Sequence, residues 1–302
     1  MRLSIALLLA GLASFLACTA VDEPAATTDR PVATLVKDSN WNAYWYAGDA
    51  EINSYALTQT RYGEPRTGDA TLIFVTEPFS ADKQVKLDDP DAAGSDKVSV
   101  LKLNAVRKFP TGIYDYSMMT SVFTPVSLDQ YPHTLKATCT SQEWCGQSFT
   151  QLNLEGGKYR VRQFSYFESE GDEDRRVDDV LLEDELLTRL RIDPTSVPTG
   201  NVELIPNLFH GRFTHDDIAP KQARIQWREG DRVNQLVVEY LHVDRTLLVD
   251  VSKSFPHTIE GWEEQGERGA AKATLRKRIK TPYWGQNANR FEALRDSLQF
   301  IF

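Results

Sequence analysis

The chain has 302 residues, of which 34 are lysine or arginine and 43 are aspartate or glutamate, so its formal net charge is −9. A nucleic-acid partner is not expected, because phosphate binding needs a positive surface. The sequence also lacks the GxSxG, HExxH, P-loop and GxGxxG motifs, and it indicates neither a cofactor nor a metal ion. These features favour a binding or scaffolding protein over an enzyme.

The N-terminal leader, residues 1–17, predicts a signal peptide. Arg2 precedes an apolar run over 3–16 that is too short to span a bilayer as a mature helix. The segment FLAC ends at Cys18 and resembles the bacterial lipobox, which implies an acyl anchor such as palmitate on this cysteine. By the same resemblance, Thr19 indicates sorting to the outer membrane, facing the periplasm or the outside. An ordinary secretory signal that leaves Cys18 as an unmodified thiol is the alternative.

The sequence after the leader divides into a tether and a globular part. Residues 18–37 are rich in proline, alanine and threonine, which favours a flexible tether. Residues 38–302 are predicted to form a single β-rich domain. An acidic loop and a proline-rich stretch mark a seam near 171–200, which either separates two domains or holds a helix across one sheet. We favour one sheet, because neither half has its own set of helices.

From residue 50 onwards, alternating segments predict about a dozen strands. Residues 223–228 alternate apolar and polar side chains, and Gly156-Gly157 between two β-rich runs is typical of a two-residue hairpin. A longer turn is expected at 63–69. Short connections make the strands antiparallel, since a parallel pair needs a long crossover. The pattern predicts a mainly β fold with a large curved antiparallel sheet or half-barrel.

Helices are expected in three places, at 38–48, 178–193 and 287–300. The central one carries several leucines, and Pro194 stops it. Over a concave sheet face, residues 178–192 would form a lid above a hydrophobic cavity of several hundred Å³ that holds an acyl chain. Alternatively, the same leucines close an ordinary core.

Cys139 and Cys145 are the two cysteines that remain after the leader. In an oxidising periplasm, such a close pair predicts a disulfide across a tight turn. Two free thiols are one alternative. Half of a metal site is the other, with His133 as the nearest further ligand.

The segment LFHGRFTHDD at 208–217 contains the densest group of candidate catalytic residues: His210, His215, Asp216 and Asp217. Histidine and carboxylate can ligate a metal or act as a base and its orienting group. In a strand, however, His210 and His215 would point to opposite faces. A solvated turn is therefore the default interpretation, and a periplasmic hydrolase that uses these side chains is the alternative function.

Aromatic residues form the second group of candidates. Trp144 and Trp262 lie in β-rich segments and could line a groove for a lipid or a sugar. In a large sheet such residues also fill the core.

Four stretches carry a resemblance to a known family: WNAYWYAGDAEINSYALTQTRYGEPRTGDATLIFVTEPF, IYDYSMMTSVFTPV, TCTSQEWCGQ, and IEGWEE with TPYWG. Together they resemble uncharacterised bacterial lipoproteins that are often labelled septum formation inhibitor Maf. The serine- and arginine-rich phosphate motif of the Maf pyrophosphatases does not occur near the start of this chain. The strand-rich pattern is also similar in architecture to LolA-like half-barrels, which carry acyl chains or lipoproteins. The resemblance implies a lipid-anchored protein with a hydrophobic ligand, and it indicates no particular protein partner.

Overall fold

The computed structural model describes residues 39–302. The predicted signal peptide, the lipid attachment at Cys18 and the tether at 18–37 lie outside these residues. Within 39–302, none of the helices combines the length and the apolar composition that a membrane span requires.

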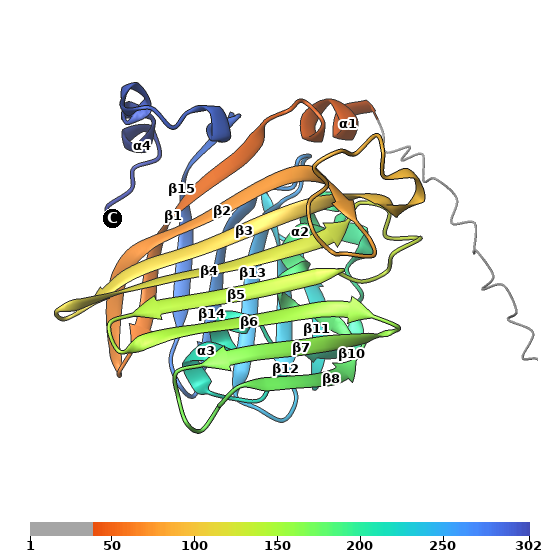
Figure 1. Cartoon of the computed structure of the whole chain (residues 1–302). Coiled ribbons are helices and arrows are strands. Elements are labelled where there is room, and N and C mark those ends of the chain that lie inside the picture. The colour runs from red at the N-terminus through yellow and green to blue at the C-terminus, as the bar shows by residue number, and fades with distance from the viewer. Residues whose placement is uncertain (1–38) are drawn as a thin grey trace, which may run out of the picture. The chain divides into compact units, whose positions relative to one another are not determined.

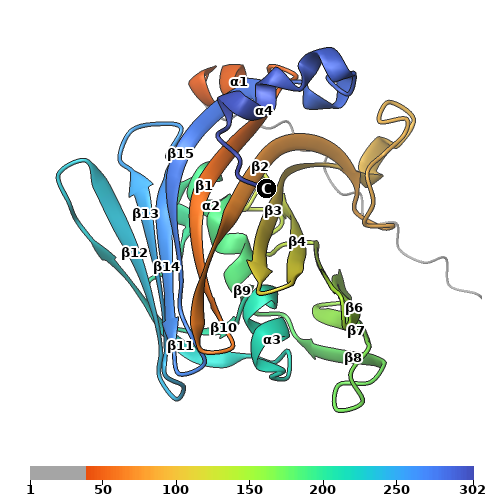
Figure 2. The same ribbon diagram turned by 90° about the vertical axis from the view of Figure 1, so that its left-hand side faces the viewer.

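Within residues 39–302, fifteen strands form one continuous sheet, which curves strongly so that its two halves face each other (Figures 1 and 2). The strands are β1 (Ala50–Arg61), β2 (Glu64–Ser80), β3 (Lys97–Thr111), β4 (Tyr114–Pro125), β5 (Lys136–Glu143), β6 (Gly146–Glu155), β7 (Lys158–Ser165), β8 (Glu173–Asp178), β9 (Leu181–Leu182), β10 (Gly200–Ile205), β11 (Lys221–Arg228), β12 (Val233–Tyr240), β13 (Arg245–Ser252), β14 (Ile259–Gly266) and β15 (Ala271–Thr281).

The strand order makes the sheet an open barrel. From one edge to the other it runs β8-β7-β6-β5-β4-β3-β2-β1-β15-β14-β13-β12-β11-β10-β9. All neighbours are antiparallel except β9 and β10, and the first and last strands pair in the middle. The two free edges, β8 and β9, are consecutive in the chain and fall within the predicted seam at 171–200. The prediction of a mainly β fold with one large curved antiparallel sheet is confirmed.

One hairpin turn is tighter than the sequence suggested. The turn expected at 63–69 is wrong, because β2 already begins at Glu64. Tyr62 and Gly63 form a two-residue turn with φ of 56° and 77°, the positive values that match strand twist in a hairpin. The hairpin predicted at Gly156-Gly157 is confirmed, with φ of 59° and 74°.

The helices are short, and α2 and α3 lie on the concave side of the sheet, between its two halves (Figure 2). They are α1 (Ser39–Trp45), α2 (Leu186–Ile192), α3 (Leu208–Thr214) and α4 (Ala293–Ser297), with 3-10 turns η1 (Gly94–Asp96), η2 (Glu183–Glu185), η3 (Pro194–Ser196), η4 (Tyr283–Gly285) and η5 (Asn289–Phe291). The helix predicted over 178–193 begins later than expected, because Leu181 and Leu182 pair with β10 as β9. It ends before Pro194, as predicted, and the expected C-terminal helix is present as α4.

The core fills the concave side of the sheet. Leu186 and Leu190 of α2 are fully buried and belong to a cluster that includes Leu103 of β3 and Val249 of β13. The space beside α2, lined partly by Trp262, has a volume of only about 50 Å³. Interiors pack closely in this way as a rule. Here the leucines of α2 close an ordinary core, and the alternative of a lid over a large acyl cavity is not supported.

The predicted disulfide is absent. Cys139 lies on β5, where it is buried and faces Thr150 of β6, while Cys145 is exposed in the turn that follows β5. An extended strand rises about 3.3 Å per residue, so these cysteines are separated by more than 10 Å, whereas a disulfide needs Cα atoms within about 7 Å. Burial also raises the pKa of the Cys139 thiol to about 12. The strand geometry therefore prevents the bridge that the spacing suggested.

The role of α2 in the core predicts a large effect of Leu190→Ala. Its side chain is 0% exposed, and removing a buried leucine side chain from a packed core costs about 2–5 kcal/mol. We expect urea unfolding to show a loss of that size in the free energy of unfolding. Leu241→Ala, at a residue that is 42% exposed, is the control and should change it by no more than about 0.5 kcal/mol. Equal effects of the two substitutions would contradict the proposed packing of α2.

Candidate functional site

One end of the sheet gathers seven connections of the chain. Because neighbouring strands are antiparallel, every second connection lies at the same end, and the pairing of Gln59 with Ala271 brings the start of β15 to the end of β1. We call this the α3 end, since α3 lies in one of its connections (Figure 1). Its connections are 62–63, 112–113, 144–145, 166–172, 206–220, 241–244 and 267–270.

Helix α3 occupies the segment that sequence reasoning treated as a strand or a solvated turn. Asn207 is its N-cap, and the Oδ1 atom of Asn207 accepts a hydrogen bond from the backbone N–H of His210 at 2.7 Å. His215 follows the last helical residue in the left-handed region, with φ of 59°. The solvated turn expected for this segment is wrong over 208–214, because the Asn207 cap starts a helix there.

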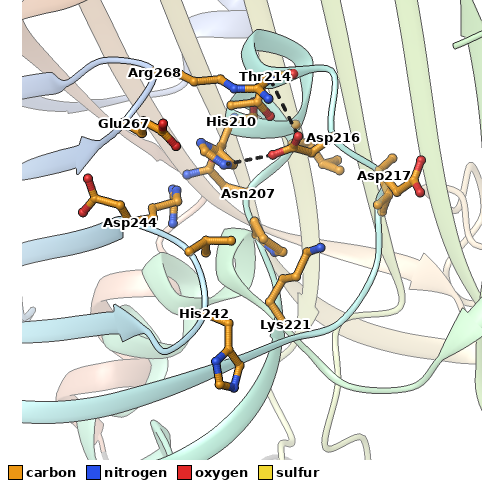
Figure 3. Close-up of a pocket in the computed structure, with 16 residues that line it drawn as sticks. Asn207, His210, Thr214, Asp216, Asp217, Lys221, His242, Asp244, Glu267 and Arg268 are labelled. Carbon is orange, nitrogen blue, oxygen red and sulfur yellow. Dashed lines mark hydrogen bonds and ion pairs between the residues drawn. The ribbon is translucent and has the colours of Figure 1, made fainter. Parts of the chain in front are cut away.

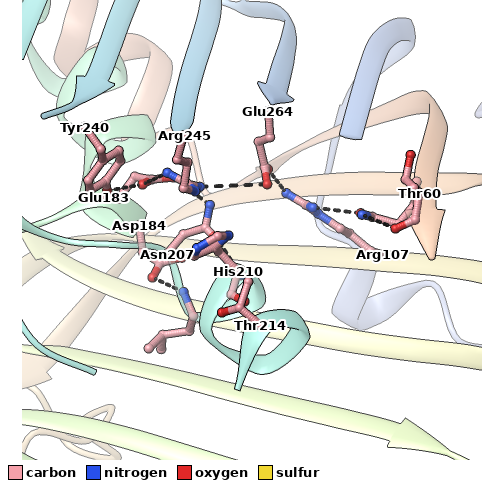
Figure 4. Close-up of polar contacts among 12 residues, drawn as sticks. Thr60, Arg107, Glu183, Asp184, Asn207, His210, Thr214, Tyr240, Arg245 and Glu264 are labelled. Atoms are coloured by element: carbon pink, nitrogen blue, oxygen red, sulfur yellow. Dashed lines mark hydrogen bonds and ion pairs between the residues drawn. The ribbon is translucent and has the colours of Figure 1, made fainter. Parts of the chain in front are cut away.

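A buried carboxylate, Glu183 of η2, fixes the start of this helix (Figure 4). Its Oε1 atom accepts hydrogen bonds from Asn207 Nδ2 at 2.6 Å and from Arg245 Nη2 at 2.7 Å. Its Oε2 atom accepts from the hydroxyl of Tyr240 and from the second guanidinium nitrogen of Arg245. Glu183 therefore ties the cap of α3 to the end of β12 and the start of β13.

The next residue, Asp184, holds α3 from a second direction. Its Oδ2 atom accepts a hydrogen bond from the backbone N–H of Leu208 at 2.9 Å. Desolvation of its half-buried side chain raises the pKa of Asp184 to about 7; the bond from Leu208 acts against this rise, and the nearby carboxylate of Glu183 adds to it. Asp184 is therefore a half-buried acid whose pKa lies near neutral pH.

A pocket of about 310 Å³ opens beside α3 (Figure 3). Three separate connections of the α3 end line it, namely 206–221, 242–245 and 267–268. In Figure 3 the side chains of His210, Asp216 and Lys221 are directed into the same space. The pocket therefore brings together residues that are far apart in the sequence.

His210 and Asp216 form one of the ionisable pairs in the pocket. The distance between His210 Nε2 and Asp216 Oδ2 is 3.9 Å, which is beyond a direct hydrogen bond. Burial lowers the pKa of His210, and the positive charge of Arg245 lowers it further. Arg268 lies on the other side of Asp216, with 3.8 Å between Nη1 and Oδ1, and it also donates to the backbone oxygen of Thr214. His210 therefore faces the pocket mainly as a neutral imidazole at pH 7.

Several further charges in the pocket have no partner of their own. Among residues 39–302, the side chains of Lys221, Asp244 and Glu267 form no hydrogen bond and no ion pair. Unpaired charges of both signs in one pocket can bind a ligand that itself carries both signs. With Asp216 and Asp217 included, the pocket has more carboxylates than cationic groups.

The structure separates the five ligand-binding residues proposed from the sequence. His210 and Asp216 line the pocket together. The Nδ1 atom of His215 instead contacts the carboxylate of Glu170. Trp144 is 73% exposed in the turn between β5 and β6, and Trp262 is 6% exposed in the core, where its ring lies 4.9 Å from that of Tyr55. These two tryptophans and the histidines do not form one site.

Sequence reasoning missed five charged residues of the pocket, namely Lys221, Asp244, Arg245, Glu267 and Arg268. Each lies at or beside the end of a strand, where charged residues are common and carry no signal of their own. The available signal was indirect, because antiparallel hairpins of known length would have placed these positions at one end. Within the part of the chain that the structure describes, no group of three or more histidine, cysteine, aspartate or glutamate side chains is arranged to hold a metal ion.

Comparisons with known proteins add a structural likeness. No known family and no curated protein matches the sequence. Among solved structures, the chain is similar to a beta-barrel-like protein of domain of unknown function DUF1849 from Brucella abortus, with 10% identity and a TM-score of 0.46. The match covers 76% of this chain and 97% of that chain. The comparisons do not support the Maf or LolA-like resemblance.

The raised pKa of Asp184 predicts an unusual dependence of stability on pH. Its pKa rises from about 3.9 in the unfolded chain to about 7 in the folded one. The folded chain favours the protonated carboxyl group of Asp184, and this contribution to the free energy of unfolding is complete below pH 4. It is lost as the pH rises to 7, by about 4 kcal/mol at most. Asp184→Asn cannot ionise, so it should gain stability relative to the wild type over this range.

The measurement is urea unfolding of both chains at several pH values between 4 and 8. Asp178→Asn is the control, because Asp178 is an exposed carboxylate that pairs only with the exposed Lys158. If Asp184→Asn and the wild type show the same pH dependence, Asp184 does not titrate near pH 7.

Proposed function

We propose that this protein is a lipid-anchored lipoprotein of the outer membrane that binds a small zwitterionic ligand in the pocket at the α3 end. The observation that carries the proposal is the set of unpaired side chains of both signs around a pocket of about 310 Å³. A cationic amine would bind the carboxylates of Glu267 and Asp216, and an anionic group would bind Lys221 and Arg268. Charge-assisted hydrogen bonds of this kind are among the strong ones.

The ligand expected from the sequence was hydrophobic, and the pocket favours a different chemistry. Its lining is dominated by ionisable and amide side chains, whereas the apolar space inside the sheet is about 50 Å³. Ligand sites for acyl chains are typically several hundred Å³ with apolar walls. We therefore propose that the pocket binds a polar head rather than an acyl chain.

The binding proposal is tested with phosphoethanolamine as the probe. It carries an amine and a phosphate, and ethanolamine and inorganic phosphate each carry only one of these groups. We expect isothermal titration calorimetry to show tighter binding of phosphoethanolamine than of either single-charge compound. The double variant Lys221→Met/Glu267→Gln should lose at least about tenfold in affinity, the equivalent of one charge-assisted hydrogen bond.

The matched control is Lys272→Met/Glu263→Gln. These two residues form an ion pair of 3.6 Å between β14 and β15, outside the pocket, so their removal leaves the pocket charges unchanged. No binding of phosphoethanolamine by the wild type, or the same loss in both double variants, would contradict the proposal.

A second candidate function, a periplasmic hydrolase, is favoured by one observation. His210 is held neutral by burial and lies 3.9 Å from Asp216, an arrangement in which the imidazole can accept a proton from water. The version expected from the sequence also used His215, but that side chain contacts Glu170 instead. Phosphorus NMR of glycerophosphoethanolamine incubated with the protein separates the two functions. A hydrolase releases a product, and His210→Gln stops it; a binding protein leaves the compound intact.

The anchor is tested by Cys18→Ser. If the thiol of Cys18 carries the acyl chains, its loss should abolish labelling with a palmitate analogue. Cell fractionation should then show no lipidated form in the outer membrane. Cys145→Ser, at an exposed cysteine of the folded domain, is the control and should keep the label. An acyl label that persists in Cys18→Ser would disprove the lipobox interpretation.

A further inference from the structure

Four neighbouring hairpin ends at the α3 end each carry one large, exposed apolar side chain. These are Tyr62 between β1 and β2, Ile113 between β3 and β4, Trp144 between β5 and β6, and Tyr166 between β7 and β8. Their exposed fractions are 58%, 82%, 73% and 65% in the same order. Isolated exposed apolar residues are common, but one at each of four adjacent turns is a patterned surface.

These side chains lie on four neighbouring hairpins, and contacts connect three of them across the sheet. The hydroxyl of Tyr114 donates to that of Tyr62 at 3.0 Å, and the ring of Tyr114 lies 6.4 Å from that of Trp144. Tyr166 covers Gly146, two residues after Trp144, so closely that a Cβ atom at Gly146 would lie 2.5 Å from the tyrosine ring. We call Tyr62, Ile113, Trp144 and Tyr166 the aromatic strip.

We propose that the aromatic strip docks on the surface of a zwitterionic phospholipid bilayer. Tryptophan and tyrosine prefer the membrane–water interface, because their rings are apolar and their polar atoms stay near water. Ile113, the most exposed of the four, would enter the acyl region most deeply.

The charges beside the strip favour a zwitterionic surface over an anionic one. The guanidinium of Arg61 lies 4.6 Å from the centre of the Tyr62 ring, and hydrogen bonds to Tyr116 Oη at 3.3 Å and to the backbone oxygen of Phe213 at 3.2 Å hold it against the protein. The connection 166–172 carries three acidic residues, and the whole chain has a net charge of −9. An anionic bilayer would repel this end of the molecule.

The length of chain before the described residues allows this contact. The first described residues lie at the opposite end of β1 from Tyr62 (Figure 1), and the 12 residues of β1 extend over about 40 Å. The 20 residues from 19 to 38 can reach at most about 70 Å. An anchor at Cys18 and the aromatic strip can therefore reach the same bilayer. The inference rests on the proposed function in one point only, the lipid anchor at Cys18 that keeps the domain near a membrane.

Docking by the strip would also explain the position of the pocket. The connections that line the pocket belong to the same end of the sheet as the strip. A molecule that rests on its aromatic strip would hold the pocket at the α3 end close to the layer of zwitterionic headgroups. The pocket and the strip would then face the same bilayer.

The test uses residues 19–302, which contain the whole described structure but no acylated cysteine. Flotation with vesicles of phosphatidylcholine and phosphatidylethanolamine measures how this chain partitions between the bilayer and water. We expect the parent chain to float with the vesicles, and Ile113→Ser/Trp144→Ser to reduce its partition coefficient at least tenfold. The matched control is Val85→Ser/Trp284→Ser, at two residues of the opposite end that are 45% and 51% exposed; it should partition like the parent.

Three results would overturn the inference. The parent chain does not float, it floats only with anionic vesicles, or both double variants reduce the partition coefficient equally. Urea unfolding of the variants checks that the fold is intact. Lys221→Met/Glu267→Gln should float normally, so loss of phosphoethanolamine binding with normal flotation would concern the pocket alone.

Discussion

The buried pair of Glu183 and Arg245 is the interaction on which the site depends. Both side chains are at most 2% exposed, and two hydrogen bonds join them. A buried charge without a partner costs several kcal/mol, so neither residue can move independently of the other. Glu183 also binds the side chain of Asn207, which caps α3. The position of His210, and with it the shape of the pocket, follows from this one carboxylate.

A second buried pair of a glutamate and an arginine lies in the segment that fills the concave side of the sheet. Arg191 of α2 donates to both carboxylate oxygens of Glu51 on β1, at 2.6 and 2.7 Å, and both side chains are fully buried. Burial alone would raise the pKa of Glu51, but the guanidinium of Arg191 holds it at about 2. These pairs give α2 one defined position on the sheet. They also explain why its leucines pack into a core and do not cover a large cavity, because a movable lid would have to leave such charges without partners.

The antiparallel topology explains why the pocket and the aromatic strip share one end. Every second turn of an antiparallel sheet lies at the same end, so turns that are distant in the chain become neighbours. The first four of these turns, from β1 to β8, carry the strip, and those between β10 and β15 carry the pocket. The two halves of the chain therefore contribute different chemistry to one end of the molecule: apolar side chains from the first and ionisable side chains from the second.

The amino-acid sequence alone was enough for the fold class, the hairpin at Gly156-Gly157 and the end of the central helix at Pro194. These features depend on side-chain alternation and on backbone preferences within a few residues. The bond between Asn207 and His210 that starts α3 is just as local, but the polar pattern of the segment predicted a solvated turn. Only the tertiary structure decided the rest. Strand pairing and register bring Glu183 to Arg245 and place Lys221 beside Arg245 in the pocket, and the hairpin register separates Cys139 from Cys145. A pocket assembled from three distant connections leaves no local pattern in the sequence, because each of its residues has an ordinary neighbourhood in the chain.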